Sequence, residues 1–202
     1  MVHIDFLIEE ESARVALNVL LPEMLPDDAL FDIYTFQGKY DLLKKLPNRL
    51  RAYRHSPLDM HKVIILIDRD EKDCRDLKQK LELMVKQAGL VSKSENPTDF
   101  QVVTRIVIDE LEAWYFGDAE ALHSAYACIP KTIQQKRGFE DPDRIAKPSK
   151  RLHQLLQKEY PGVDRLLKVE AAARISAYMS PDVNQSKSFQ AFYAGVKACC
   201  RE

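Results

Sequence analysis

The chain has 202 residues, enough for one or two domains. Hydrophobic residues make up 46% and charged residues 30%, so the chain can bury a core and is not intrinsically disordered. The formal net charge is −1, which excludes a uniformly basic coat for nucleic acid and a polyanionic tail.

The sequence lacks the signatures of several functional classes. No apolar run reaches about 18 residues, and no basic segment followed by an apolar one opens the chain, so we expect a cytoplasmic protein without a membrane segment. The 4 cysteines show neither CxxC pairs nor zinc-finger spacing, which indicates reduced thiols. The glycine motifs of Rossmann dinucleotide sites and P-loops are absent.

The first elements alternate between strand and helix. Residues 2–8 place apolar side chains at every second position, which predicts a strand. A helical pattern begins at Ser12, and we expect Pro22 and Pro26 to end it. Residues 30–36 are rich in aromatic and β-branched side chains, which predicts a second strand.

The alternation continues to about residue 110. Residues 40–53 carry leucines at helical spacing, with a break predicted at Pro47. Residues 63–67 form a continuous apolar run, typical of a strand buried on both faces in a parallel sheet. A helix at 77–88 and a strand at 101–108 follow. The pattern predicts an α/β fold with a mostly parallel sheet flanked by helices.

The rest of the chain has no strand pattern. We expect five helical segments there: residues 111–116, 119–126, 151–159, 163–178 and 188–200. The predicted organisation is an α/β domain at residues 1–117 and a helical C-terminal extension at 118–202 packed on it.

Acidic residues follow three of the predicted strands. Because parallel strands end at one edge of the sheet, these carboxylates should converge there, where open α/β sheets bind ligands. Crowded carboxylates repel each other, and a hard divalent cation such as Mg²⁺ or Mn²⁺ removes that penalty. The residues are Glu9, Glu10 and Glu11; Asp68, Asp70 and Asp73; and Asp109, Glu110 and Glu112.

A simpler interpretation remains open for each group. Glu10, Glu11 and Asp73 are also favourable charges for the first turn of a helix. Taken alone, Asp68 is also suited to cap a helix N-terminus, and Asp109 with Glu110 can be solvated.

The segments at residues 6–9 (FLIE) and 64–70 (IILIDRD) resemble the Toprim domain of topoisomerases, primases and related nucleases. Residues 36–39 (FQGK), 42–51 (LLKKLPNRLR) and 110–114 (ELEAW) resemble more closely an uncharacterised bacterial Toprim-like family, often encoded beside AAA-type ATPases. The chain differs from the usual Toprim pattern after Glu9, where a glycine is common.

The resemblance implies a role for each matching acidic residue. Glu9 would be a metal ligand or general acid/base, and Asp68 and Asp70 would be metal ligands for Mg²⁺ or Mn²⁺. Glu112 would add an acid near the metal, with Trp114 packed behind it as a core residue.

Basic residues gather in two segments. Lys39, beside the end of the second strand, is expected to neutralise phosphate charge at the site. A solvated helix face explains the first segment equally well. The candidate nucleic-acid contacts are Lys39, Lys44, Lys45, Arg49, Lys147 and Lys150.

The pattern favours metal-dependent phosphodiester chemistry on nucleic acid, with hydrolysis of the nuclease type. The alternative is a non-enzymatic interaction or effector subunit of an ATPase-associated defence system, with a vestigial metal site. Phosphoryl signalling on Asp68 is a third, weaker reading, because no lysine follows a later strand. His61 precedes the third predicted strand, away from the acidic edge, which favours a structural role.

Overall fold

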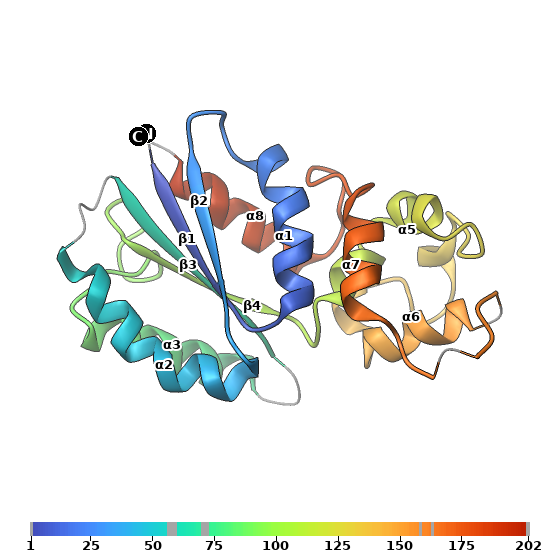
Figure 1. The fold of residues 1–202 in the computed structure, drawn as a ribbon, viewed down its shortest axis with the longest axis horizontal. Coiled ribbons are helices and arrows are strands. Elements are labelled where there is room, and N and C mark those ends of the chain that lie inside the picture. The colour runs from blue at the N-terminus through green and yellow to red at the C-terminus, as the bar shows by residue number, and fades with distance from the viewer. Residues whose placement is uncertain (1, 56–59, 70–72, 158, 163, 201–202) are drawn as a thin grey trace.

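A parallel four-stranded sheet forms the centre of the molecule in the computed structural model, which describes residues 2–55, 60–69, 73–157, 159–162 and 164–200. The strand order is β2-β1-β3-β4 (Figure 1). The strands are β1 (His3–Ile8), β2 (Leu30–Thr35), β3 (His61–Asp68) and β4 (Val102–Val107). The predicted α/β class and parallel sheet are therefore confirmed.

The strands end together at one edge. Ile8 pairs with Thr35 of β2 and with Leu66 of β3, and Asp68 pairs with Val107 of β4. The residues that follow β1, β3 and β4 therefore leave the sheet at the same edge.

Two layers of helices cover the sheet. Helices α1 (Glu11–Met24) and α8 (Lys187–Cys199) cover one face, and α2 (Gly38–Ala52) and α3 (Cys74–Gln87) cover the other (Figure 1). Successive residues of β3 join different cores: Ile64 packs on the α1 and α8 side, and Ile65 on the α2 and α3 side. This two-sided burial explains the continuous apolar run of β3.

Two proline predictions were wrong. Helix α1 continues through Pro22 to Met24, and α2 continues through Pro47. Leu21 and Met24 are buried around the first proline, as Leu46 and Leu50 are around the second. Packing of these leucines and the methionine offsets the hydrogen bond that each proline removes.

The second half of the chain adds short helices beside the sheet. They are α4 (Glu112–Phe116), α5 (Ala119–Ala125), α6 (Pro148–Leu156) and α7 (Lys168–Ser176), with 3₁₀ turns at Tyr53–His55, Ile133–Gln135 and Pro142–Arg144. Helix α7 packs against α1. The core on the α1 side continues without interruption into residues such as Phe116, Leu152 and Ile175.

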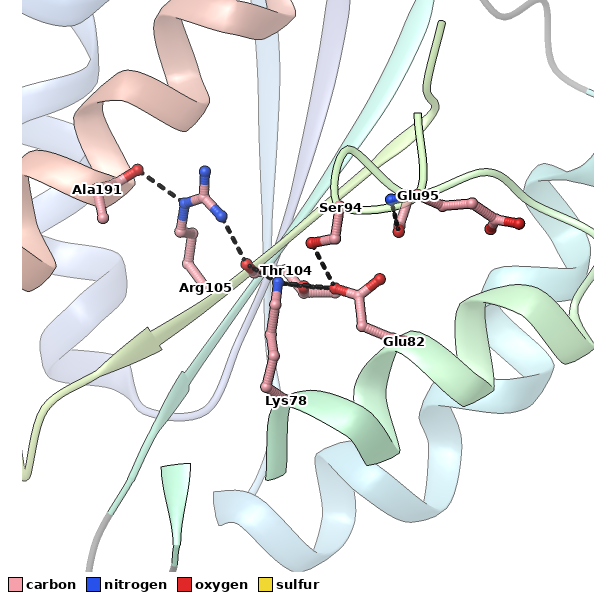
Figure 2. A network of polar contacts seen from close by, with 8 residues as sticks. Lys78, Glu82, Ser94, Glu95, Thr104, Arg105 and Ala191 are labelled. Carbon is pink, nitrogen blue, oxygen red and sulfur yellow. Dashed lines mark hydrogen bonds and ion pairs between the residues drawn. The ribbon is translucent and has the colours of Figure 1, made fainter. Parts of the chain in front are cut away.

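A polar network holds the outer strand β4 (Figure 2). The Lys78 ammonium on α3 donates to the backbone oxygen of Thr104 at 3.0 Å and lies 2.7 Å from Glu82. Arg105 donates to the backbone oxygen of Ala191 on α8 at 2.7 Å. These contacts tie the outer strand β4 to the helices on both faces of the sheet. The Lys78 bond also satisfies the backbone oxygen of Thr104 on this edge strand.

None of the helices in the described ranges has the length and apolar character needed to cross a bilayer.

Candidate functional site

Glu9 and Asp68 meet at the carboxyl edge of the sheet. Glu9 directly follows β1, Asp68 is the last residue of β3, and the two strands are neighbours. The Oε2 atom of Glu9 accepts a hydrogen bond from the backbone N–H of Asp68 at 3.2 Å. Both side chains are buried, at 9% and 8% exposure. The predicted convergence of these two acids is present in the structure.

The surroundings of Asp68 disfavour its charged form. Burial raises its pKa well above the usual range, and the nearby charges of Glu9, Glu10 and Glu112 add to the effect. A carboxyl group in this position is held protonated or needs a compensating cation.

Glu112 joins the site from the first turn of α4. It is 1% exposed, and neither of its carboxylate oxygens makes a hydrogen bond within the part of the chain that the structure describes. Burial raises its pKa to about 7, against the opposing effect of Lys168. The hydroxyl of Tyr115 is also buried without a hydrogen bond there. Buried polar groups without partners are rare and indicate a water or an ion in the space they face.

Lys168 lies among the acids and was missed by the sequence reasoning. Its Nζ atom lies 3.4 Å from an oxygen of Glu10, 3.8 Å from one of Glu110 and 3.7 Å from one of Glu112. Burial opposes its charge, but the carboxylates of Glu112, Glu10 and Glu110 outweigh that effect and raise its pKa. No local pattern marks this residue, because it arrives only when α7 packs against α1.

Of the other two acids after β1, one belongs to the cluster and one does not. Glu10 accepts from the Ser12 hydroxyl and faces Lys168, so it belongs to the cluster. Glu11 turns outward to pair with Arg14, and the hydrogen bond from Arg14 lowers its pKa. Its alternative role as a favourable helix-start charge fits this position.

Two acids further along the chain have structural partners. Asp73 caps α3 by accepting from the backbone N–H of Arg75 at 2.7 Å. Asp109, in a left-handed backbone conformation, pairs with Arg69. Asp70 lies outside the described residues.

The predicted basic residues do not form one surface. Lys39 begins α2 at the acidic edge and donates to the backbone oxygen of Arg69 at 3.1 Å. Lys44 is exposed further along α2, and Lys45 pairs with Asp41. Arg49 stacks on Tyr34, 3.9 Å from the ring centre, and lies 3.9 Å from the Asp5 carboxylate. Ten residues of helix separate it from Lys39, which is ~15 Å.

The second basic segment borders the acidic cluster. Lys147 and Lys150 flank the start of α6, where the backbone N–H of Ser149 donates to Glu110 at 3.0 Å. Beside them is an open cavity of about 980 Å³ between α6 and α7. Its lining includes Lys150, Arg165 and Lys168, so Lys168 borders both the cavity and the acids.

The acids form a looser set than a closed metal cage. No three of the cluster's described carboxylates place oxygens all within 4.8 Å of one another. A small cavity of about 10 Å³, lined by Glu9, Glu10 and Asp68 among others, lies between them. Mg²⁺ commonly takes one or two carboxylates and keeps several waters, so an oxygen-only set in which Glu112 accepts no hydrogen bond from the described chain fits Mg²⁺ or Mn²⁺.

An all-parallel sheet with buried carboxylates and lysines at its carboxyl edge defines an open-sheet α/β protein with its candidate site at the strand ends. The chain belongs to the family described as a domain of unknown function, DUF4276, whose model matches residues 8–197. That range contains both Glu9 and Lys168. No curated protein and no solved structure matches the chain.

Proposed function

We propose that the protein is Toprim-like and carries out metal-dependent phosphodiester chemistry on nucleic acid, most simply hydrolysis. One observation carries the proposal: the Glu112 carboxylate is buried without a hydrogen bond in the described chain, beside the paired Glu9 and Asp68. Burying a carboxylate that accepts no hydrogen bond, with only the Lys168 ammonium at 3.7 Å, destabilises the fold, so a purely structural role does not explain an acid there.

The residues suggest a division of work. Asp68 and Glu112, with Glu9, would hold Mg²⁺ or Mn²⁺, and the ion would polarise a phosphate oxygen and lower the pKa of a bound water. Glu9 would act as general acid/base at the edge of the sheet. Lys39 and Lys168 would offset the negative charge of the phosphate, because their ammonium groups lie at the same edge as the acids.

Nucleic acid would bind on the side of the site formed by α6 and α7. Lys147 and Lys150 border the acidic cluster there, and the adjoining cavity also contains Arg165. Such a surface suits backbone phosphates and carries no base readout. Lys45 pairs with Asp41 and Arg49 stacks on Tyr34, so neither is part of the proposed surface.

A specific observation favours the second candidate. The Lys168 ammonium already balances the charges of Glu10, Glu110 and Glu112. An intramolecular cation at this position would suit a vestigial metal site in a non-enzymatic interaction or effector subunit, with an AAA-type ATPase as its partner.

Nuclease assays separate the two candidates. Plasmid and single-stranded oligonucleotides of DNA and RNA are incubated with the protein in Mn²⁺, Mg²⁺ or EDTA. The nuclease proposal expects cleavage in Mn²⁺ that Asp68→Asn and Glu112→Gln abolish. Glu11→Gln is the matched control, since Glu11 is an acid of the same edge that pairs outward with Arg14. Absence of cleavage, or equal cleavage by Asp68→Asn, would reject the proposal.

A further inference from the structure

A second cluster of titratable side chains lies where the strands begin, at the opposite edge of the sheet from the acids. His3 and Asp5 are two residues apart on β1, so they point to the same face. His61 pairs with His3 in the register of β1 and β3, and Asp32 pairs with Asp5 in that of β1 and β2. Strand alternation therefore brings two imidazoles and two carboxylates from three neighbouring strands together.

The atoms that face each other are metal-ligand atoms. The Nε2 atom of His3 lies 3.1 Å from Oδ1 of Asp5 and 3.1 Å from Oδ2 of Asp32. The Nε2 atom of His61 lies 3.4 Å from Oδ2 of Asp5. One ligand atom from each of His3, Asp5 and His61 fits within a mutual distance of 4.8 Å. Ligands about 2.0–2.1 Å from a tetrahedral Zn²⁺ lie roughly 3.3 Å apart, which these separations match.

Hydrogen bonds within the cluster do not satisfy its polar atoms. The Nε2 atom of His61 is buried and makes no hydrogen bond to any residue in the described ranges. His3 faces two carboxylates with a single ring nitrogen, which can donate at most one proton. A bound cation would serve both imidazoles and the Asp5 carboxylate at once.

The outer contacts are those that orient metal ligands. The Tyr53 hydroxyl donates to Oδ2 of Asp5, and Arg49 donates to the Tyr53 oxygen at 3.0 Å. Asp5 is 3% exposed, whereas the side chains of His3 and Asp32 are 35% and 58% exposed. The ligands are thus held from the inside by a hydrogen-bonded chain and open to solvent on the other side.

We propose that His3, Asp5 and His61 bind a divalent transition-metal ion of the Zn²⁺ type, with the fourth position open to solvent. Two imidazole nitrogens favour Zn²⁺ and its neighbours over Mg²⁺, which prefers oxygen alone. The ion would join β1 and β3 near their starting edge and stabilise the sheet. This site is separate from the acidic cluster and does not depend on the proposed function.

The test is zinc binding by the full chain without an affinity tag. Protein stripped with EDTA is titrated with Zn²⁺ against a chromophoric chelator, in excess Mg²⁺ to occupy oxygen-only sites. We expect one Zn²⁺ per chain and a higher melting temperature. His3→Gln and His61→Gln should each weaken zinc binding by more than about tenfold. Loss of a residue that only orients a ligand already weakens metal binding by about tenfold or more, and loss of a ligand should cost more. Substitution of Co²⁺ should give the visible spectrum of a tetrahedral site without a thiolate band, which excludes the cysteines.

Control variants keep the result interpretable. His55→Gln removes an exposed imidazole from the neighbouring 3₁₀ turn and should bind as the wild type does. Asp68→Asn should also keep full zinc affinity, even if it abolishes every activity of the acidic cluster. His3 is partly exposed, so we expect His3→Gln to remain folded, and circular dichroism checks this. A wild-type protein that binds no Zn²⁺, or a folded His3→Gln that binds it as tightly, would overturn the proposal.

Discussion

The ammonium of Lys168 lies 3.7 Å from Oε1 of Glu112, yet burial still raises the pKa of Glu112 to about 7. The two residues come from α7 and α4 and meet at the edge where β1 and β3 end. Lys168 is thus a partial counterion in a buried acidic site.

Glu112 should make stability fall as pH rises. Its pKa is raised from 4.5 to about 7, so between these values the folded protein holds a proton that the unfolded chain has released. The folded state therefore binds more protons than the unfolded state, and the free energy of unfolding drops by up to about 3 kcal/mol across this range. Urea denaturation at pH 5 and pH 8 in EDTA measures the drop. Glu112→Gln should make the drop smaller, while the raised pKa of Asp68 keeps part of it, and an unchanged pH dependence in that variant would contradict the assignment.

Removing the Lys168 ammonium should destabilise the protein. Lys168→Met leaves Glu10, Glu110 and Glu112 without their shared cation, at an expected cost of about 1–3 kcal/mol near neutral pH. Millimolar Mg²⁺ should restore part of this loss if the cluster accepts an ion. The control is Lys131→Met, whose exposed pair with Glu120 should contribute less than about 1 kcal/mol. Equal effects of the two substitutions would show that Lys168 is not a counterion.

Lys39 and Lys150 should affect nucleic-acid binding, and Lys45 should not. Lys39→Gln and Lys150→Gln each remove one phosphate contact, so the slope of log affinity against log salt should become shallower by about 1 in magnitude. Lys45→Gln removes the same charge from α2, where Lys45 pairs with Asp41. Fluorescence anisotropy with a labelled oligonucleotide at several salt concentrations measures the slopes. Identical slopes for all three variants would contradict the assigned surface.

Gly117 should tolerate no side chain. A Cβ atom there would lie 2.0 Å from Oδ1 of Asn184, whose amide donates to the backbone oxygen of Trp114 at 2.9 Å. Gly117→Ala should therefore lower the free energy of unfolding by about 1–3 kcal/mol. Adding Asn184→Ala should cost less than the sum of the two single changes, because it removes the contacts with Asn184 and leaves only the 2.9 Å approach to the backbone nitrogen of Ser186. Strict additivity in denaturant unfolding would show that the two residues do not compete for space.

The sequence predicts the sheet better than it predicts the site. Alternation over 2–8 and the apolar run at 63–67 are local signals, so the strand–helix order and the meeting of Glu9 with Asp68 could be predicted. Lys168 could not, because its place depends on the packing of α7 on α1. The extension of α1 beyond Pro22 depends on tertiary packing in the same way.

The cluster of His3, Asp5 and His61 could not be predicted from the sequence, because it depends on the register of the strands. His61 is the first residue of β3 rather than a residue before it, and it pairs with His3. Neither histidine has a metal-binding spacing along the chain, since 58 positions separate them in sequence. Only the register of β1 against β3 brings them together.

The most direct measurement is a Mn²⁺ titration of the acidic cluster, followed by calorimetry or by the loss of free Mn²⁺ signal in electron paramagnetic resonance. It uses protein carrying His3→Gln, so that the second cluster does not contribute. We expect saturable Mn²⁺ binding that Asp68→Asn and Glu112→Gln each abolish, while Glu11→Gln preserves it. No binding, or binding unchanged in Asp68→Asn, would contradict the central claim that these carboxylates hold a divalent cation.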